Sequence, residues 1–286
     1  MSYDIAVIGA GPAGLSAAVQ ARARNKRVLV VGGDRRDGPL YKAERVDNYL
    51  GLPHIPGGEL LSRFEAQAAE QGVERKTGRA LNIMPMGGKF YISIGSDVEE
   101  AGAIILATGV AHGKKYPGEA ERLGAGVSYC ATCDGMLYRG KDVVVVGKSG
   151  EAPAEANYLR EIGCNVTYVS GKAPEGLDAD IPFVKAARLE ITGAPGSLAL
   201  RADAMQLPCA CVFILRAAVA PTDLLPGLAL EGGYVAVDRC MRTNIPGVFA
   251  AGDCTGLPLQ VSKAVGEGLV AGHRAAEYLD RNKETI

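Results

Sequence analysis

Two cysteines in CxxC spacing carry the clearest chemistry in this chain of 286 residues, in the run Cys130-Ala131-Thr132-Cys133-Asp134. Thiols at this spacing can close into a disulfide, and a thiolate from such a pair can attack a disulfide in another protein. A carboxyl group beside the pair can give or take the proton that the exchange requires. We therefore predict a redox site with Cys130, Cys133 and Asp134 as its catalytic residues.

Zinc binding and inert thiols are the alternative interpretations of this pair. A zinc site needs two further ligands at short spacing, but the sequence has only three scattered histidines and no second CxxC. We therefore expect no metal site.

The other five cysteines have a simpler interpretation. Cys164, Cys240 and Cys254 stand alone beside apolar or glycine-rich segments, as small buried side chains often do. The run Cys209-Ala210-Cys211 is expected to place two thiols on one face of a strand. A second redox or metal site there stays an alternative to simple packing.

A glycine-rich run has the spacing of a dinucleotide-binding loop: Gly9-Ala10-Gly11-Pro12-Ala13-Gly14. Gly9 permits the tight turn, Gly11 lets backbone approach a pyrophosphate, and Gly14 lets the helix pack close to the strand. The anion would lie at the N-terminus of the helix. A structural turn is the alternative. Asp34 lies further along the chain than the acidic residue that holds a ribose in this motif, so the sequence does not identify the residue that contacts the ribose.

The elements around this loop alternate between strand and helix. The sequence predicts a parallel βαβ unit with a strand at 3–8, a helix at 13–24 and a strand at 28–31. The same order recurs with a strand at 142–146, a helix at 154–162 and a strand at 165–169. Two such starts predict an α/β fold with two doubly wound, dinucleotide-binding-type domains.

Two polar breaks place the domain boundaries. The first, residues 111–118, follows a predicted strand at 103–107, and the second, residues 239–246, precedes a strand at 247–251 and a helix at 260–279. The C-terminal piece is too short to form a core alone. We therefore predict a discontinuous first domain, residues 1–114 and 238–286, and a second domain of residues 115–237.

Composition excludes several classes of protein. Lys plus Arg total 31 against 32 for Asp plus Glu, so there is no basic surplus for a nucleic acid. The longest uncharged apolar stretch, residues 5–21, is broken by glycines and is short for the ~20 residues of a membrane span. The acidic N-terminus differs from a secretory signal. We expect a cytoplasmic protein that binds neither nucleic acid nor membrane.

The sequence resembles the flavoprotein disulfide reductases, and specifically the small thioredoxin reductases, over nearly its whole length. The resemblance rests on the glycine loop and the CxxC run through Gly135, and on three further segments: Val46-Asp47-Asn48-Tyr49-Leu50-Gly51, Ala107-Thr108-Gly109 and Thr243-Asn244-Ile245-Pro246-Gly247-Val248-Phe249-Ala250-Ala251-Gly252-Asp253. It implies a homodimer that binds FAD in the first domain. In the family, an arginine usually precedes the glutamine near the flavin, and this chain has Leu259 before Gln260.

The resemblance also assigns the residues that bind FAD. In addition to the glycine loop, with Gly9, Gly11, Pro12, Ala13 and Gly14, they are Asn48, Thr108, Gly109, Gly252, Asp253 and Gln260.

The second domain departs from NADPH-using relatives at three places. Ser149 stands where the family has the second glycine of the loop, and Ser170 with Lys172 replaces a basic cluster at the tip of the next strand. Arg216-Ala217-Ala218 follows the strand at 213–215 in place of a glycine that would admit nicotinamide. We expect that NAD(P)H is not bound, and the chain is most similar to the ferredoxin-dependent flavin thioredoxin reductases.

The predicted activity is reduction of a thioredoxin-like protein. Electrons would come from reduced ferredoxin or flavodoxin and pass through FAD and the Cys130/Cys133 pair. An NADPH-dependent enzyme with an atypical pocket and a non-catalytic flavin redox sensor are the alternatives. A basic group could meet an acidic ferredoxin: Lys114, Lys115, Arg139 and Lys141.

Overall fold

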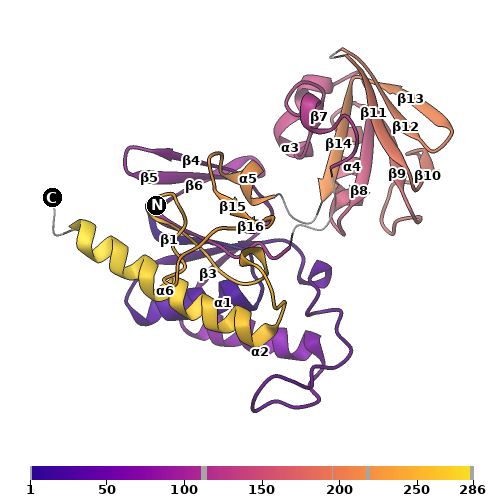
Figure 1. Ribbon diagram of the computed structural model, residues 1–286. Coiled ribbons are helices and arrows are strands. Elements are labelled where there is room, and N and C mark those ends of the chain that lie inside the picture. Colours follow the sequence, from indigo (N-terminus) through magenta and orange to yellow (C-terminus); the bar gives the residue numbers. More distant parts are fainter. Residues whose placement is uncertain (1, 111–114, 195, 217–219, 284–286) are drawn as a thin grey trace. The chain divides into compact units, whose positions relative to one another are not determined.

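The computed structural model describes residues 2–110, 115–194, 196–216 and 220–283. The chain forms two compact units: unit 1 contains residues 1–111 and 218–286, and unit 2 contains residues 112–217. Both units are built on sheets with parallel strands and flanking helices (Figure 1). The predicted fold class is confirmed.

Unit 2 ends at residue 217, which is 20 residues before the predicted boundary at 237. The segment that follows unit 2 contains the helix α5 (Pro221–Leu224), which packs against a strand of unit 1. No polar break marks this boundary, since the sequence there is the apolar run from Ala217 to Pro221. The first boundary, at 111, lies close to the predicted 114.

Unit 1 contains a seven-stranded sheet in the order β3-β2-β1-β6-β5-β4, with β17 also paired to β6. The strands β1, β2, β3, β6 and β17 run parallel, whereas β4 and β5 form an antiparallel extension. The strands are β1 (Ser2–Ile8), β2 (Val28–Gly32), β3 (Glu74–Thr77), β4 (Ala80–Met86), β5 (Lys89–Ile94), β6 (Asp97–Leu106) and β17 (Val248–Ala250). The antiparallel pair β15 (Leu230–Glu231) and β16 (Tyr234–Val235) stands apart from this sheet.

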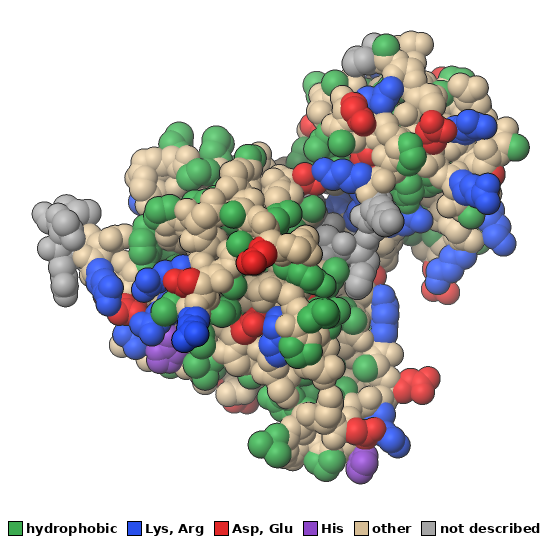
Figure 2. All heavy atoms as spheres, viewed as in Figure 1, with side chains coloured by type: hydrophobic (Ala, Val, Ile, Leu, Met, Phe, Trp, Pro, Cys, Tyr) green, Lys and Arg blue, Asp and Glu red, His purple; other side chains and the backbone are tan. Residues whose placement is uncertain are grey.

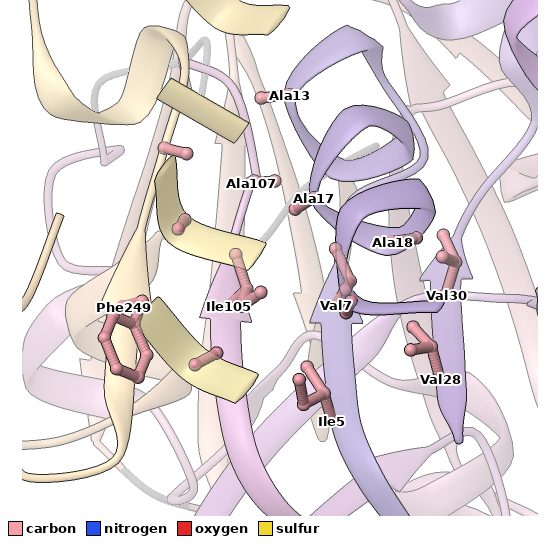
Figure 3. Packing of buried hydrophobic residues seen from close by; sticks show 14 of the residues in the cluster. Ile5, Val7, Ala13, Ala17, Ala18, Val28, Val30, Ile105, Ala107 and Phe249 are labelled. Carbon is pink, nitrogen blue, oxygen red and sulfur yellow. The ribbon is translucent and has the colours of Figure 1, made fainter. Parts of the chain in front are cut away.

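Three longer helices accompany the sheet of unit 1: α1 (Pro12–Ala23), α2 (Gly57–Glu70) and α6 (Val261–Lys283). The core between α1, α6 and the sheet consists mostly of alanine, valine and isoleucine (Figure 3). Small residues allow the two helices to approach closely, because a Cβ on Gly268 would lie 2.2 Å from the carbonyl oxygen of Ala13. The hydroxyl of Ser16 also donates a hydrogen bond to the carbonyl of Val265, at 2.7 Å. This contact fixes the start of α1 against the start of α6.

Unit 2 contains a parallel five-stranded sheet, β10-β9-β8-β14-β7, and an antiparallel three-stranded sheet, β11-β12-β13. One core lies between the two sheets, and the other lies under α3 and α4. The elements are β7 (Val127–Ser128), α3 (Ala131–Asp134), β8 (Asp142–Lys148), α4 (Ala152–Glu161), β9 (Asn165–Ser170), β10 (Phe183–Lys185), β11 (Leu189–Ala194), β12 (Ser197–Ala202), β13 (Met205–Cys209) and β14 (Cys211–Arg216).

Charged side chains of both signs are interspersed on the face shown in Figure 2, as expected from a net charge of -1. Within the described ranges, the model has no helix whose length and apolar character would let it cross a membrane.

Candidate active site

Three parallel strands of unit 1 end at the same level of the sheet. Ile8 of β1 and Ala250 of β17 both pair in register with Leu106 of β6. The peptide N–H of Ala107 donates to the carbonyl of Ile8 at 2.8 Å, and that of Ala251 donates to Leu106 at 2.9 Å. The glycine loop, Thr108-Gly109 and Gly252-Asp253 therefore meet at one sheet edge, although they come from distant parts of the sequence.

The glycines of the loop have different neighbours. Gly9 has φ +122°, and a Cβ there would lie 2.0 Å from the carbonyl oxygen of Ala107. A Cβ on Gly14 would lie 1.9 Å from the carbonyl oxygen of Gly9. At Gly11, by contrast, no heavy atom of the described chain comes within 4 Å of a Cβ. The fold itself thus requires Gly9 and Gly14, whereas Gly11 leaves open space at the N-terminus of α1.

Two predicted flavin-site residues from opposite ends of the sequence are in contact. The amide nitrogen Nδ2 of Asn48 donates to Oε1 of Gln260 at 2.7 Å. Gln260 directly precedes α6, and both side chains are exposed. They can therefore turn toward a ligand at this edge.

Thr108 has a buried hydroxyl oxygen that lacks a hydrogen-bond partner among the described residues. The neighbouring Cys254 thiol donates to the carbonyls of Leu106 and Ala251, at 3.4 and 3.3 Å. A buried polar atom without a partner is costly. The hydroxyl is thus placed to bond a group that enters the edge.

The turn that carries Asp253 is held by two residues of α6 that the sequence analysis did not single out. The ammonium group of Lys263 donates to the carbonyls of Gly252 and Gly256, at 2.9 and 2.7 Å, and Glu267 accepts the N–H of Gly252 at 2.8 Å. Lys263 and Glu267 form an i,i+4 ion pair at 3.2 Å. The i,i+4 spacing of Lys263 and Glu267 in the helix that follows Gly252-Asp253 is the sequence signal that could have indicated this pair.

Asp34, the acidic residue that follows β2, already forms hydrogen bonds with its neighbour Arg36. Its carboxylate accepts the backbone N–H of Arg36 at 2.8 Å and pairs with the guanidinium of the same residue. These hydrogen bonds lower the pKa of Asp34 to about 2. Asp34 therefore caps the turn that follows β2.

The predicted redox pair is a disulfide in unit 2, with its two Cα atoms 5.4 Å apart. Cys130 begins the short helix α3, and its sulfur accepts the N–H of Cys133 at 3.0 Å. Cys130 is only 7% exposed, whereas Cys133 is exposed. A group that reaches the disulfide from outside unit 2 therefore meets Cys133 first.

Ser128 links Asp134 to the start of the disulfide segment. Its hydroxyl donates to Oδ2 of Asp134 at 2.7 Å and accepts the N–H of Cys130 at 3.1 Å. Ser128 is buried, and no motif in the sequence marks it as a site residue. The carboxylate of Asp134 is thus tied to the segment that carries the disulfide.

These observations agree with the comparisons with known proteins. A model of the pyridine nucleotide-disulphide oxidoreductase family matches residues 3–268. The chain belongs to this family. It is 35% identical to the thioredoxin reductase of Treponema pallidum, across 97% of both chains. The structure is similar to that of a ferredoxin-flavin thioredoxin reductase from Clostridium acetobutylicum, with TM-score 0.93 and 40% identity over 99% of both chains.

A second solved relative, a thioredoxin reductase from Gloeobacter violaceus, has TM-score 0.86 and 29% identity, over 99% of this chain and 95% of the other. The resemblance to flavoprotein disulfide reductases inferred from the sequence is confirmed. In this oxidoreductase, the Cys130–Cys133 bond is the redox disulfide.

The remaining buried thiols are poor nucleophiles. Burial raises the pKa of Cys209 to about 11 and that of Cys211 to about 12. Burial also raises the pKa of Cys254 to about 11 and increases the pKa of Cys164. The expectation that Cys209 and Cys211 share one strand face was wrong: Cys209 ends β13, Cys211 begins β14, and they lie in separate cores.

The corresponding edge of unit 2 differs from that of unit 1. Gly147 lies near the end of β8, and a Cβ there would lie 1.8 Å from the hydroxyl of Tyr168. The buried ring of Tyr168 therefore fills the space beneath the loop. Ser149 has a buried hydroxyl oxygen with no partner in the described part of the chain. Ser170 donates to the carbonyl of Lys172 at 2.5 Å and closes its own turn.

Arg216, at the end of β14, forms a polar cluster at this edge. Its guanidinium donates twice to the buried carboxylate of Glu119, at 2.7 and 2.8 Å. In the sheet, Arg216 pairs in register with Lys148 of β8. The ring centroid of Tyr116 lies 5.3 Å from the guanidinium carbon of Arg216 and 5.9 Å from Nζ of Lys148. Ala217 and Ala218, which the sequence analysis also noted, lie outside the described residues.

Proposed function

We propose that this chain is a thioredoxin reductase that takes electrons one at a time from reduced ferredoxin or flavodoxin. They would pass through FAD in unit 1 and the Cys130–Cys133 disulfide to the disulfide of a thioredoxin-like protein. Per turnover, two reduced ferredoxins, two protons and one disulfide of the thioredoxin-like protein yield two oxidised ferredoxins and one dithiol. The observation that carries the proposal is the filled edge of unit 2, where Tyr168 lies against Gly147 and Arg216 is bound to the carboxylate of Glu119.

The likeness to the Clostridium acetobutylicum enzyme, which is a ferredoxin-flavin thioredoxin reductase, supports this donor. Hydride transfer requires nicotinamide to be held close to the flavin ring, and a nucleotide needs an open backbone approach and a clamp for its phosphates. In unit 2, the Ser149 side chain stands on the loop, and Ser170 bonds its own turn. Single-electron transfer needs only docking of the donor at the surface.

The residues of unit 1 fit FAD. The open space at Gly11, at the start of α1, would receive the pyrophosphate, and the hydroxyl of Thr108 would gain a partner. By resemblance, Asp253 would hold the ribityl chain, with Asn48 and Gln260 near the ring. When bound, FAD supplies a carrier that accepts electrons singly and delivers them as a pair.

The disulfide chemistry then follows from the pair itself. Two electrons and two protons convert the Cys130–Cys133 bond into two thiols. One thiolate attacks the disulfide of the partner and forms a mixed disulfide, and the second thiol resolves it. The partner leaves as a dithiol, and the Cys130–Cys133 bond is restored. Asp134, held by Ser128, is placed to exchange a proton during this cycle.

The surroundings of the disulfide offer contacts for protein partners. Met136 and Leu137 follow the pair and are 56% and 68% exposed, which suits an apolar contact with a thioredoxin-like protein. Arg139 and Lys141 are exposed nearby and carry the charge for an acidic ferredoxin. Lys115 is exposed too, whereas Lys114 lies outside the described residues. The family resemblance further leads us to propose a homodimer.

The decisive experiment compares electron donors under anaerobic conditions. The purified FAD-loaded protein is mixed in turn with NADPH, NADH and reduced ferredoxin, and flavin absorbance is followed in a stopped-flow instrument. We expect rapid bleaching only with ferredoxin, and turnover that weakens as salt shortens the Debye length toward about 8 Å. Rapid bleaching by NADPH would overturn the donor assignment.

A cysteine series tests the route that electrons take. Cys130→Ser and Cys133→Ser should abolish thioredoxin reduction but leave FAD binding and flavin reduction by ferredoxin intact. Cys240→Ser is the matched control and should keep full turnover. Full activity in either CxxC variant would mean that electrons leave by another route. Absence of thioredoxin reduction in the wild-type protein would favour a redox sensor.

A further inference from the structure

Glu119 is a fully buried carboxylate that accepts four hydrogen bonds. The donors are the peptide N–H of Tyr116 at 2.8 Å, the hydroxyl of Tyr129 at 2.7 Å, and two guanidinium N–H groups of Arg216 at 2.7 and 2.8 Å. The Glu119 side chain is 0% exposed, and that of Arg216 is 15% exposed. A buried charge is tolerated only with such a complete set of partners.

Glu119 is ionised in this setting. Burial alone would raise its pKa, but the hydrogen bonds from Arg216, Tyr116 and Tyr129 outweigh burial and hold the pKa of Glu119 below its usual value. The guanidinium carbon of Arg216 also lies 5.3 and 5.9 Å from the ring centroids of Tyr116 and Tyr129. The charge pair and the two rings therefore form one connected group.

This group lies where three parts of unit 2 converge. The chain enters unit 2 at residue 112 and leaves it at residue 217. Tyr116 follows the entry, Arg216 precedes the exit, and Tyr129 directly precedes Cys130. Glu119 thus joins a residue near the entry and a residue near the exit of unit 2 to the segment that carries the redox disulfide.

The strand pairing strengthens this link. β7 (Val127–Ser128) leads into Tyr129 and runs parallel to β14, with Val127 paired to Val212 and Ser128 paired to Phe213. Arg216 at the end of β14 is therefore linked to Tyr129 both through the sheet and through Glu119. Ser128 extends this link to the disulfide segment, because its hydroxyl accepts the N–H of Cys130.

We propose that Glu119 is a positioning residue for the entry of electrons into the disulfide. Through its hydrogen bonds, it fixes the orientation of the Cys130–Cys133 segment relative to Tyr116 and Arg216, which lie near the entry and the exit of unit 2. The step it serves is reduction of the S–S bond by two electrons and two protons to two thiols. The proposal rests on the proposed function for the source of the electrons, but it does not depend on the identity of the donor.

The test separates entry of electrons into the disulfide from their exit. For entry, the flavin of the FAD-loaded protein is photoreduced anaerobically with EDTA, and the return of its absorbance reports transfer to the disulfide. For exit, the disulfide is reduced with dithiothreitol, the reagent is removed, and transfer to oxidised thioredoxin is followed. Since light supplies the electrons, failure of ferredoxin as donor leaves this test unaffected.

Tyr129→Phe is the most informative variant, because it removes one hydrogen bond and keeps the Glu119–Arg216 pair. We expect entry to slow roughly tenfold, as loss of a hydrogen bond to a charged group implies, while the exit rate and the KM for thioredoxin stay unchanged. Glu119→Gln should slow entry at least as much. Glu121→Gln, at an exposed position two residues away, is the matched control and should behave as wild type.

Arg216 provides the rescue experiment. Arg216→Lys keeps the charge beside Glu119 and should retain more of the entry rate than Arg216→Met. If Arg216→Met does not fold, Tyr129→Phe still decides the question. A wild-type entry rate in Tyr129→Phe would overturn the proposal. An equal loss in entry and exit would also overturn it, because Glu119 would then only stabilise the cysteine segment.

Discussion

Substitution of Gly11 by alanine should separate FAD binding from folding of unit 1. Gly11 has φ -84°, an ordinary value for any residue, and a Cβ there meets no described heavy atom within 4 Å. Alanine is a weaker N-cap than glycine, so the free energy of unfolding of the FAD-free protein should fall by less than about 1 kcal/mol. The added methyl group nevertheless lies where backbone would meet the pyrophosphate.

Gly9→Ala and Gly14→Ala are the controls with the opposite expectation. Their Cβ atoms would lie 2.0 and 1.9 Å from backbone carbonyl oxygens, and Gly9 also has φ +122°. A left-handed backbone costs alanine about 1–2 kcal/mol, and relief of the overlap costs a further 1–3 kcal/mol or so. At roughly 2–4 °C per kcal/mol, the melting temperature of Gly9→Ala should fall by about 4–20 °C, even without FAD. For Gly14→Ala, where only the overlap counts, the fall should be about 2–12 °C.

Two measurements decide between these outcomes. Circular dichroism follows thermal unfolding of the FAD-free proteins, and quenching of flavin fluorescence gives the dissociation constant for FAD. For Gly11→Ala we expect a near wild-type melting temperature and at least a tenfold weaker affinity, equivalent to about 1.4 kcal/mol. Wild-type affinity would remove the pyrophosphate assignment. A melting temperature as low as that of Gly9→Ala would show that the fold itself needs the space.

Three further predictions concern unit 2 and the free thiols. Ser149→Gly alone should give no NADPH-driven flavin bleaching in stopped-flow measurements, because Arg216 still occupies the edge; rapid bleaching would contradict this. Iodoacetamide at pH 8 should label Cys240 before Cys211, whose pKa is raised to about 12 by burial, and equal labelling by mass spectrometry would refute it. The pKa of Glu119 is lower in the folded protein than its usual 4.5, so the stability it contributes is complete above pH 4.5 and is lost as pH falls through the folded pKa. Urea unfolding between pH 7 and 3 should show a smaller loss in Glu119→Gln, and an identical pH profile would count against this.

Short sequence patterns predicted the strands and helices whose conformation depends mainly on neighbouring residues in the chain. The strand expected at 3–8 is β1 (Ser2–Ile8), and the helix expected at 13–24 is α1 (Pro12–Ala23). Apolar runs and glycine spacing fix these elements with little help from the rest of the chain. The three-stranded sheet β11-β12-β13 was not predicted, because its short strands alternate weakly and gain their stability from the core they share with the parallel sheet.

The sequence motifs do not predict contacts between residues that are far apart in the chain. Glu119 and Arg216 are 97 residues apart. The sequence marks Arg216 only as a departure from the family pattern, and Glu119 belongs to no recognisable pattern. A lone glutamate after a proline-containing break is typical of a solvated loop, and only tertiary packing reveals that it is buried. Asn48 and Gln260, 212 residues apart, could be placed together only through family resemblance, and the structure joins them by a hydrogen bond.

The edge at the carboxyl ends of the parallel strands differs between the sheets of the two units. In unit 1 the edge is lined by small residues: Gly11 leaves open space at the start of α1, and the buried hydroxyl of Thr108 has no partner in the part of the chain that the structure describes. In unit 2, larger side chains fill the equivalent edge, with Tyr168 beneath Gly147 and Arg216 bound to a buried carboxylate. A fold that binds dinucleotides does so by leaving this edge open. The filled edge instead joins Arg216, at the end of β14, to Tyr129 beside the disulfide, through the buried carboxylate of Glu119.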